Sequence, residues 1–222
     1  MNTRFCLATI AALIALAILV SAWLYPRLPD TIPIHWNLRG EADGFGSKSW
    51  AVWVMPATMA GLTLLLYLVL PAVSPRSFQV DSFRDVYNLI IVFVTLFLFV
   101  IHLITLRLSL DDQFDASRSI LVAFFAFLVL IGNLMGKLRR NLWMGIRVPW
   151  TLASERVWID THRLAAWIWV AAGLLGALLA WADQTLLALV PLTLAILTPI
   201  LYSYLHYRDL LRRGELDLDP TA

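Results

Sequence analysis

The chain has 222 residues, of which 60% are hydrophobic and 14% are charged, and its mean hydropathy is +0.77. A soluble domain of this length needs a larger polar surface, so the composition excludes one and indicates a polytopic membrane protein. The net charge of +2 is too small to favour direct nucleic-acid binding, and the single cysteine, Cys6, excludes an intrachain disulfide or a thiolate metal cluster.

Six apolar segments are long enough to cross a bilayer whose hydrocarbon core is about 30 Å thick. They cover residues 5–24, 50–73, 86–109, 119–135, 164–181 and 185–204. We therefore expect an all-α membrane fold: a bundle of six transmembrane helices with a turn-rich outer loop and an amphipathic helix in a cytoplasmic loop. The first segment also resembles a secretory signal with a cleavage site at Val20-Ser21-Ala22, but its length favours a retained helix.

The distribution of Lys and Arg predicts the orientation of the chain. If the N-terminus is inside, twelve of the 17 basic residues fall on the inner side of the membrane and five on the outer side. The positive-inside rule therefore places both termini in the cytoplasm, with residues 207–222 as a cytoplasmic tail.

The outer loop, residues 25–50, is rich in turn-forming Pro and Gly residues. Residues 31–36 alternate weakly in polarity and could form a short strand. The side chains that could bind a ligand or a metal are His35, Trp36, Asn37, Glu41, Asp43 and Lys48. Their spacing matches neither a zinc site nor a calcium-binding loop, so the metal is unassigned. A compact cap held by its own hydrogen bonds is the alternative to a binding site.

Ionisable groups within the spans are few, and each is a candidate functional group. We expect His102, as a neutral imidazole, and Asn88 and Asn133 to hydrogen-bond to neighbouring helices. No span carries the series of Asp or Glu residues expected of a proton-coupled transporter. The sequence also lacks the motifs of an activated nucleophile, a zinc protease or a phosphate-binding loop, so neither catalysis nor a cofactor is expected.

The inner loop, residues 137–163, combines a basic cluster with aromatic residues. Pro149 predicts a turn, after which Thr151 can cap the helix that follows. Arg156 and Asp160 lie four residues apart and are expected to pair on this amphipathic helix, which would run directly into the fifth span. Such a segment could simply anchor the protein on anionic lipid.

A resemblance to a known family is carried by residues 132–173, which read GNLMGKLRRNLWMGIRVPWTLASERVWIDTHRLAAWIWVAAG. They resemble the signature of the SdpI-type immunity protein family, in which a glycine-bearing helix end leads into a pattern close to GIR-T-PWTL-S-E-VW--THR. The matching residues are Gly145, Ile146, Arg147, Pro149, Trp150, Thr151, Leu152, Ser154, Glu155, Val157, Trp158, Thr161, His162 and Arg163. Arg140 and Val148 depart from the pattern, where members often carry proline and threonine.

The outer loop resembles a second, uncharacterised domain that commonly precedes this signature, with a pattern close to LP--IPIHWN--GE-DG-GSK. The matching residues are Leu28, Pro29, Ile32, Pro33, Ile34, His35, Trp36, Asn37, Gly40, Glu41, Asp43, Gly44, Gly46, Ser47 and Lys48. The two resemblances divide the chain into an N-terminal part at 1–73, an SdpI-like four-helix region at 86–206 and the tail at 207–222.

The resemblance implies a bacterial plasma-membrane protein that confers immunity to a secreted peptide toxin. It also implies signalling, in which toxin at the outer face biases the packing of the fourth and fifth spans and a DNA-binding repressor docks at the cytoplasmic face. Membrane lipids are further partners. The residues assigned to partner binding are Gly145, Arg147, Pro149, Trp150, Thr151, Glu155, Trp158, His162 and Arg163. A membrane enzyme or small-molecule transporter that uses the outer loop is the alternative, and a structural scaffold is a third interpretation.

Overall fold

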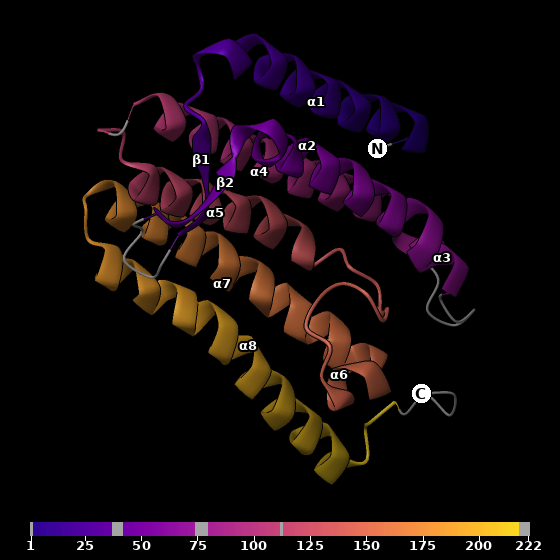
Figure 1. Ribbon diagram of the computed structural model, residues 1–222. Coiled ribbons are helices and arrows are strands. Elements are labelled where there is room, and N and C mark those ends of the chain that lie inside the picture. The colour runs from indigo at the N-terminus through magenta and orange to yellow at the C-terminus, as the bar shows by residue number, and fades with distance from the viewer. Residues whose placement is uncertain (1, 37–41, 74–79, 112, 218–222) are drawn as a thin grey trace.

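The computed structural model describes residues 2–36, 42–73, 80–111 and 113–217. Within these residues, six helical stretches are long and apolar enough to cross a membrane, which confirms the predicted bundle (Figure 1). The stretches are Thr3–Arg27, Lys48–Val73, Val80–Leu110, Ala116–Met135, Glu155–Trp181 and Thr185–Arg213. The chain is therefore a multi-pass membrane protein.

The elements follow the predicted spans closely and add short turns at their ends. The helices are α1 (Thr3–Leu24), α2 (Lys48–Leu64), α3 (Leu70–Val73), α4 (Arg84–Leu110), α5 (Ala116–Met135), α6 (Pro149–Ala153), α7 (Glu155–Trp181) and α8 (Thr185–Arg213). The shorter helical turns are η1 (Tyr25–Arg27), the π-helical η2 (Leu65–Val69) between α2 and α3, and η4 (Val80–Phe83). The strands are β1 (Thr31–Trp36) and β2 (Ala42–Ser47).

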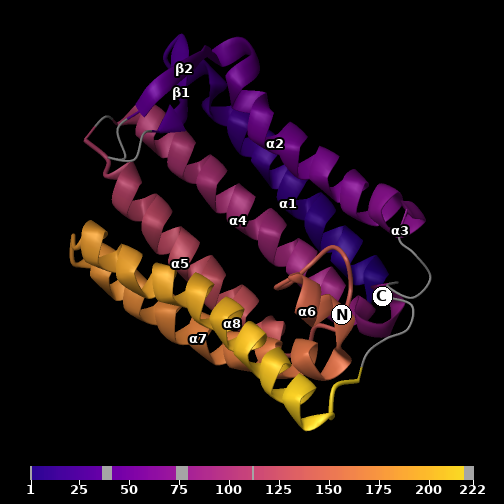
Figure 2. The same ribbon diagram turned by 90° about the horizontal axis from the view of Figure 1, so that it is seen from below.

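The long helices lie side by side in a fixed order (Figures 1 and 2). Helix α4 packs against α1 and α2 on one side and against α5 on the other, and α7 lies between α5 and α8. The N-terminus, α3, α6 and the end of α8 gather at one end of the bundle, whereas the two strands lie at the opposite end. The two loops singled out by sequence are therefore separated by the length of the bundle.

Polar side chains join α4 to its neighbours inside the bundle. The Ser21 hydroxyl lies 2.8 Å from His102 Nε2, which links α1 to α4. The Asn88 side chain accepts a hydrogen bond from the Tyr67 hydroxyl at 2.9 Å and donates one to the Thr3 hydroxyl at 3.0 Å. These contacts confirm that His102 and Asn88 hydrogen-bond to neighbouring helices. The same prediction is wrong for Asn133, which is exposed and has no side-chain hydrogen bond within the described residues.

Helices α5 and α7 approach closely because glycine occupies their shared face. A Cβ atom added at Gly176 would lie 2.2 Å from the Phe125 ring, and one added at Gly132 would lie 2.9 Å from the Trp169 Cβ. Small residues allow such close backbone contact in membrane helices. The Trp169 indole N–H also donates to the Ala195 carbonyl at 2.9 Å, so α5, α7 and α8 pack as one unit.

The β-hairpin covers the end of the bundle opposite the α5–α7 connection. Strands β1 and β2 pair in antiparallel fashion, with Ile32 opposite Gly46, and β1 confirms the strand predicted at residues 31–36. Ile32 is buried and packs in one cluster with Val52 of α2 and Leu106 of α4. The hairpin is thus fixed to two helices through its apolar face.

Candidate functional site

The segment that joins α5 to α7, residues 136–154, is called the motif loop below. Its first half is organised by Asn141, whose side chain is fully buried. The Asn141 side-chain oxygen accepts from the backbone N–H groups of Trp143 and Met144 at 2.8 and 2.7 Å. Its amide donates to the carbonyls of Arg139 and Met144 at 2.9 and 3.1 Å. Sequence reasoning missed this residue, although asparagine before a glycine-containing turn commonly bonds to nearby backbone groups.

Gly145 allows the loop to close onto α7. Its φ angle is +103°, and an added Cβ atom would lie 2.4 Å from His162 Nε2. The backbone N–H of Ile146 donates to this same nitrogen at 3.0 Å. Because a backbone N–H can only donate, Nε2 carries no proton, and the proton on Nδ1 is donated to the Trp158 carbonyl at 2.8 Å. His162 therefore acts here as a neutral bridge between the loop and α7.

Trp158 fastens α7 to the first residues of the motif loop. Its ring stacks on the imidazole of His162 with centroids 4.0 Å apart and planes 21° apart. Its indole N–H donates to the Leu138 carbonyl at 2.8 Å, and the side chain is fully buried. Trp158 and His162 are buried and pack with the exposed Gly145 as a single unit, so in this conformation the two side chains shape the loop and do not present a surface to a partner.

Thr151 is buried inside the turn rather than at the start of the helix, which corrects the predicted cap. Helix α6 begins at Pro149, whose fixed φ suits the first helical position. The Thr151 hydroxyl accepts from the Val148 N–H at 3.1 Å and donates to the Ile146 carbonyl at 2.7 Å. These bonds hold the turn closed and leave Thr151 unable to touch a partner in this conformation.

Helix α7 is capped by Ser154, not by Thr151. Ser154 is extended, with φ −138° and ψ 125°, and its hydroxyl accepts from the Val157 N–H at 3.2 Å. Helix α7 continues without a break from Glu155 to Trp181, so the predicted loop helix does run directly into the fifth span, but it starts three residues later than predicted because Ser154 separates it from α6. Glu155 lies in the first turn of α7, where its charge favours the helix dipole, and it pairs with Arg140 at 3.5 Å.

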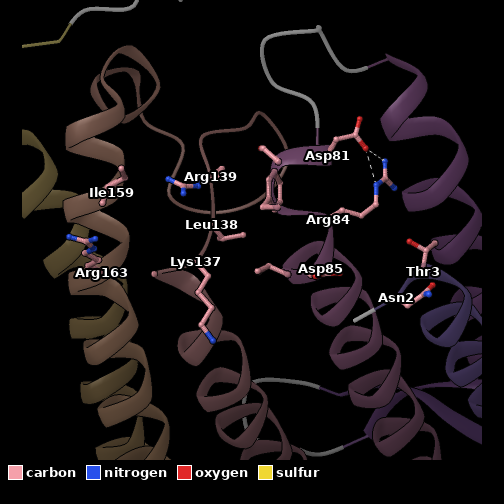
Figure 3. Close-up of a pocket in the computed structure, with 14 residues that line it drawn as sticks. Asn2, Thr3, Asp81, Arg84, Asp85, Lys137, Leu138, Arg139, Ile159 and Arg163 are labelled. Atoms are coloured by element: carbon pink, nitrogen blue, oxygen red, sulfur yellow. Dashed lines mark hydrogen bonds and ion pairs between the residues drawn. The ribbon is translucent and has the colours of Figure 1, made fainter.

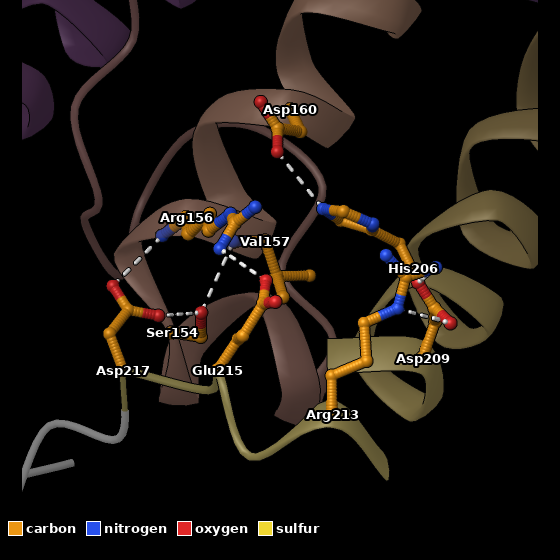
Figure 4. A network of polar contacts seen from close by, with 9 residues as sticks. All are labelled: Ser154, Arg156, Val157, Asp160, His206, Asp209, Arg213, Glu215 and Asp217. Carbon is orange, nitrogen blue, oxygen red and sulfur yellow. Dashed lines mark hydrogen bonds and ion pairs between the residues drawn. The ribbon is translucent and has the colours of Figure 1, made fainter. Parts of the chain in front are cut away.

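The predicted pair between Arg156 and Asp160 is wrong, because both residues have partners from the chain after α8 or from α8 itself (Figure 4). Arg156 donates to Glu215 at 3.2 Å, and His206 of α8 lies 2.9 Å from the Asp160 carboxylate. The Asp217 carboxylate accepts from the Ser154 hydroxyl and from the Arg156 backbone N–H. These long-range contacts fold the segment after α8 back onto the start of α7.

The remaining predicted partner-binding residues lie at the surface. Arg147 and Pro149 are exposed, and the Arg147 side chain donates to the Leu142 carbonyl at 2.5 Å. Arg163 is exposed on α7. Trp150 is half-buried, and its indole N–H donates to the Ser203 hydroxyl of α8 at 2.6 Å. The family motif thus divides into a buried part that closes the loop and an exposed, mainly charged part.

At the other end, the hairpin brings only some of the predicted ligand residues together. His35 and Asp43 lie 2.5 Å apart across the two strands, and both are substantially exposed. Lys48 pairs with Asp30 at 3.3 Å and also donates to the Leu28 carbonyl.

The structure does not describe the side chains of the other predicted outer-loop ligands. Trp36 ends β1, whereas Asn37 and Glu41 lie outside the described residues. Within the described part of the chain, no group of three His, Cys, Asp or Glu side chains could hold a metal ion. The described contacts are those of a cap held by its own polar pairs.

Comparison with known proteins shows one similar protein and two family models that match parts of the chain. It is 29% identical over 204 residues to the immunity protein SdpI of Bacillus subtilis (strain 168), which covers 89% of this chain and 94% of that protein. The SdpI/YfhL protein family matches residues 137–203, from the motif loop through most of α8.

The match confirms the resemblance inferred from the motif. A domain of unknown function (DUF1648) matches residues 12–60, which include the hairpin and precede the SdpI/YfhL region. No solved structure shows a significant match to the chain. The arrangement of the motif loop is therefore described here from its own contacts.

Proposed function

We propose that this chain is a non-enzymatic membrane immunity protein that protects its cell from a secreted peptide toxin. The observation that carries the proposal is the alignment with the immunity protein SdpI, which spans 89% of this chain and 94% of that protein. An alignment of this extent favours a shared role for the whole protein over a shared helical bundle alone.

The proposed orientation places both termini and the motif loop in the cytoplasm of a bacterial cell. Arg84, Lys137, Arg139 and Arg163 line one cavity at the end of the bundle where the N-terminus lies. Basic residues at the cytoplasmic end are what the positive-inside rule favours. The hairpin then faces the outside, where it is positioned to meet a secreted peptide.

The proposed signalling step uses the exposed part of the motif as a docking surface for a DNA-binding repressor. This surface comprises Arg147, Glu155, Arg156 and Arg163, which are exposed or half-buried around the closed loop. The packed unit of Gly145, Trp158 and His162 would set whether the loop is closed or open. Toxin binding outside would change this equilibrium by contacting one packing of the helices better than the other.

Complementation tests the immunity role. The chain is expressed in a Bacillus subtilis strain that lacks its own SdpI, and survival is measured in culture medium conditioned by the parent strain. We expect survival to rise toward the level given by SdpI at equal amounts of protein in the membrane. Absence of any protection at matched abundance contradicts the proposed function.

Single substitutions then test the docking surface. Arg147→Ala and Glu155→Ala are compared with Arg212→Ala, which removes an exposed charge from the end of α8. We expect the first two to reduce the fraction of a co-expressed repressor that sediments with membranes, while Arg212→Ala leaves it unchanged. If all three variants recruit repressor equally and protect equally, the docking surface lies elsewhere.

A further inference from the structure

A cavity of about 970 Å³ opens at the end of the bundle that carries the motif loop (Figure 3). Its walls come from the start of α4 with η4, from the end of α5 and the first residues of the motif loop, and from α7. Figure 3 shows Lys137 and Arg139 between Arg163 of α7 and Arg84 of α4. The cavity therefore lies between two groups of helices, α1, α2 and α4 on one side and α5, α7 and α8 on the other, at the level where the helices end.

The lining of this cavity is electropositive. Its charged side chains are Arg84, Lys137, Arg139, Arg163, Asp81 and Asp85, which together give a net charge of +2. Arg84 is bonded to Asp81 through its Nε at 2.9 Å, and Asp85 takes part in an interaction of its own.

Three of the cations are left uncompensated. Lys137, Arg139 and Arg163 form no ion pair within the described residues. Three unpaired cations around one cavity repel one another and attract a multivalent anion, and a phosphate is the group that Arg and Lys bind best together.

An apolar groove lies on the same pair of helices, deeper in the bundle. It has a volume of about 180 Å³ between α4 and α5, and every residue that lines it is apolar. The small side chains of Ala123 and Ala126 make room for the groove on α5, and Phe93 and Leu96 line it on α4. The rise of a helix puts Phe93 about 12 Å beyond Asp85, within the ~15 Å half-thickness of a bilayer core.

We propose that the cavity and the groove together bind one anionic phospholipid, with its phosphate near Lys137, Arg139 and Arg163 and an acyl chain between α4 and α5. The cavity alone would suit any phosphate, but the groove on the same helices selects a ligand with an apolar tail. Basic pockets between membrane helices at the cytoplasmic side bind anionic headgroups in this way. The site is independent of the proposed immunity function, since it requires neither toxin nor repressor.

Lipid retention by the purified full-length chain tests the site. The protein in detergent is supplied with phosphatidylglycerol or phosphatidylcholine, and bound lipid is measured by native mass spectrometry. We expect preferential binding of phosphatidylglycerol and loss of about 100-fold in its affinity in the Lys137→Gln, Arg139→Gln, Arg163→Gln variant, since each basic side chain contributes roughly fivefold. Equal binding of the two lipids by the unmodified chain overturns the proposal.

A matched control separates the site from general surface charge. Arg208→Gln, Arg212→Gln and Arg213→Gln together remove the same charge from the end of α8. This variant is expected to keep its preference for phosphatidylglycerol, and an equal loss in both triple variants contradicts a defined site. If the cavity variant does not elute as a folded protein, Lys137→Gln alone is used, with an expected loss of about fivefold.

A second pair of variants distinguishes a lipid from free phosphate. Ala126→Phe fills the groove, whereas Ala171→Phe adds the same ring at an exposed position on α7. We expect only Ala126→Phe to weaken binding of phosphatidylglycerol, and neither variant to change binding of inorganic phosphate. If Ala126→Phe leaves lipid binding unchanged and inorganic phosphate displaces the lipid fully, the cavity is a simple anion site and the lipid assignment is wrong.

Discussion

Replacing Gly145 by alanine tests whether the closed motif loop depends on the fit between this glycine and His162. The alanine Cβ atom would lie 2.4 Å from His162 Nε2, and the backbone would have to keep a φ of +103°. Residues with a Cβ atom rarely adopt that backbone conformation, so both the His162 ring and the backbone at position 145 must shift. Movement of the ring also breaks the hydrogen bond from the Ile146 N–H.

The size of the effect follows from these three changes. An unfavourable backbone conformation costs about 1–3 kcal/mol. Overpacking a buried contact costs about 1–3 kcal/mol, and loss of a hydrogen bond costs about 1 kcal/mol. The contributions overlap, because one movement relieves both the clash and the strain, so we expect about 3 kcal/mol. This is roughly a 100-fold increase in the population of the open loop.

Gly214→Ala is the matched control, because Gly214 also has a positive φ, of +69°, but an added Cβ atom there meets nothing within 4 Å. The control therefore carries the backbone strain without the clash. Hydrogen exchange of the peptide that contains Ile146 is measured for both variants in detergent. We expect faster exchange there in Gly145→Ala alone. Equal exchange in the two variants would refute the reasoning that His162 holds the loop closed.

Two further substitutions test the packing around the loop. Gly176→Ala places a methyl group against the ring of Phe125 and should destabilise the bundle by about 1–3 kcal/mol, whereas Gly61→Ala meets open space. Equal thermal stability of these two variants would mean that the stability of the bundle does not depend on close contact between α5 and α7. Ser154→Ala removes the α7 cap and the bond to Asp217, at a cost of about 1 kcal/mol. Cleavage after α8 by a protease should become faster than in the unmodified chain, and an unchanged rate contradicts the fold-back of that segment.

Much of the bundle could be predicted from sequence because its signals are local. The length of an apolar run determines whether a helix can cross a membrane, and each predicted run became a helix. His102 and Asn88 were assigned to interhelical hydrogen bonds because a polar group among apolar helices needs a partner. Their partners, Ser21 and Thr3, could not be named, since only the packing of α1 on α4 brings them together.

The candidate site was harder to predict because several residues of the motif loop and the start of α7 have more than one possible hydrogen-bond or ion-pair partner. Thr151 and Ser154 are both good caps, and the choice between them depends on Pro149, which starts α6 early and buries the Thr151 hydroxyl. Arg156 is four residues from Asp160, but the segment after α8 brings Glu215 within 3.2 Å of it. Local spacing cannot reveal a partner that arrives from the other end of the sequence.

The packing also indicates where the bundle can move. The predicted mechanism shifted the fourth span against the fifth, that is, α5 against α7. Their interface is the least suited to such a change, because glycines at 132, 173 and 176 hold it in close contact. The interface between α4 and α5 instead contains a groove of about 180 Å³. A rearrangement therefore costs least if α5, α7 and α8 move together relative to α1, α2 and α4.

Such a movement would act directly on the motif loop and on the basic cavity. The loop is fastened to α7 by the bond from Trp158 to Leu138 and would travel with α7 as a closed unit. The cavity, in contrast, has walls from both halves, since Arg84 lies on α4 and Arg163 on α7. Its shape would change with every shift between the halves. An anionic lipid held there would favour one arrangement, and a signal from the hairpin, which is fixed to α2 and α4, would have to compete with it.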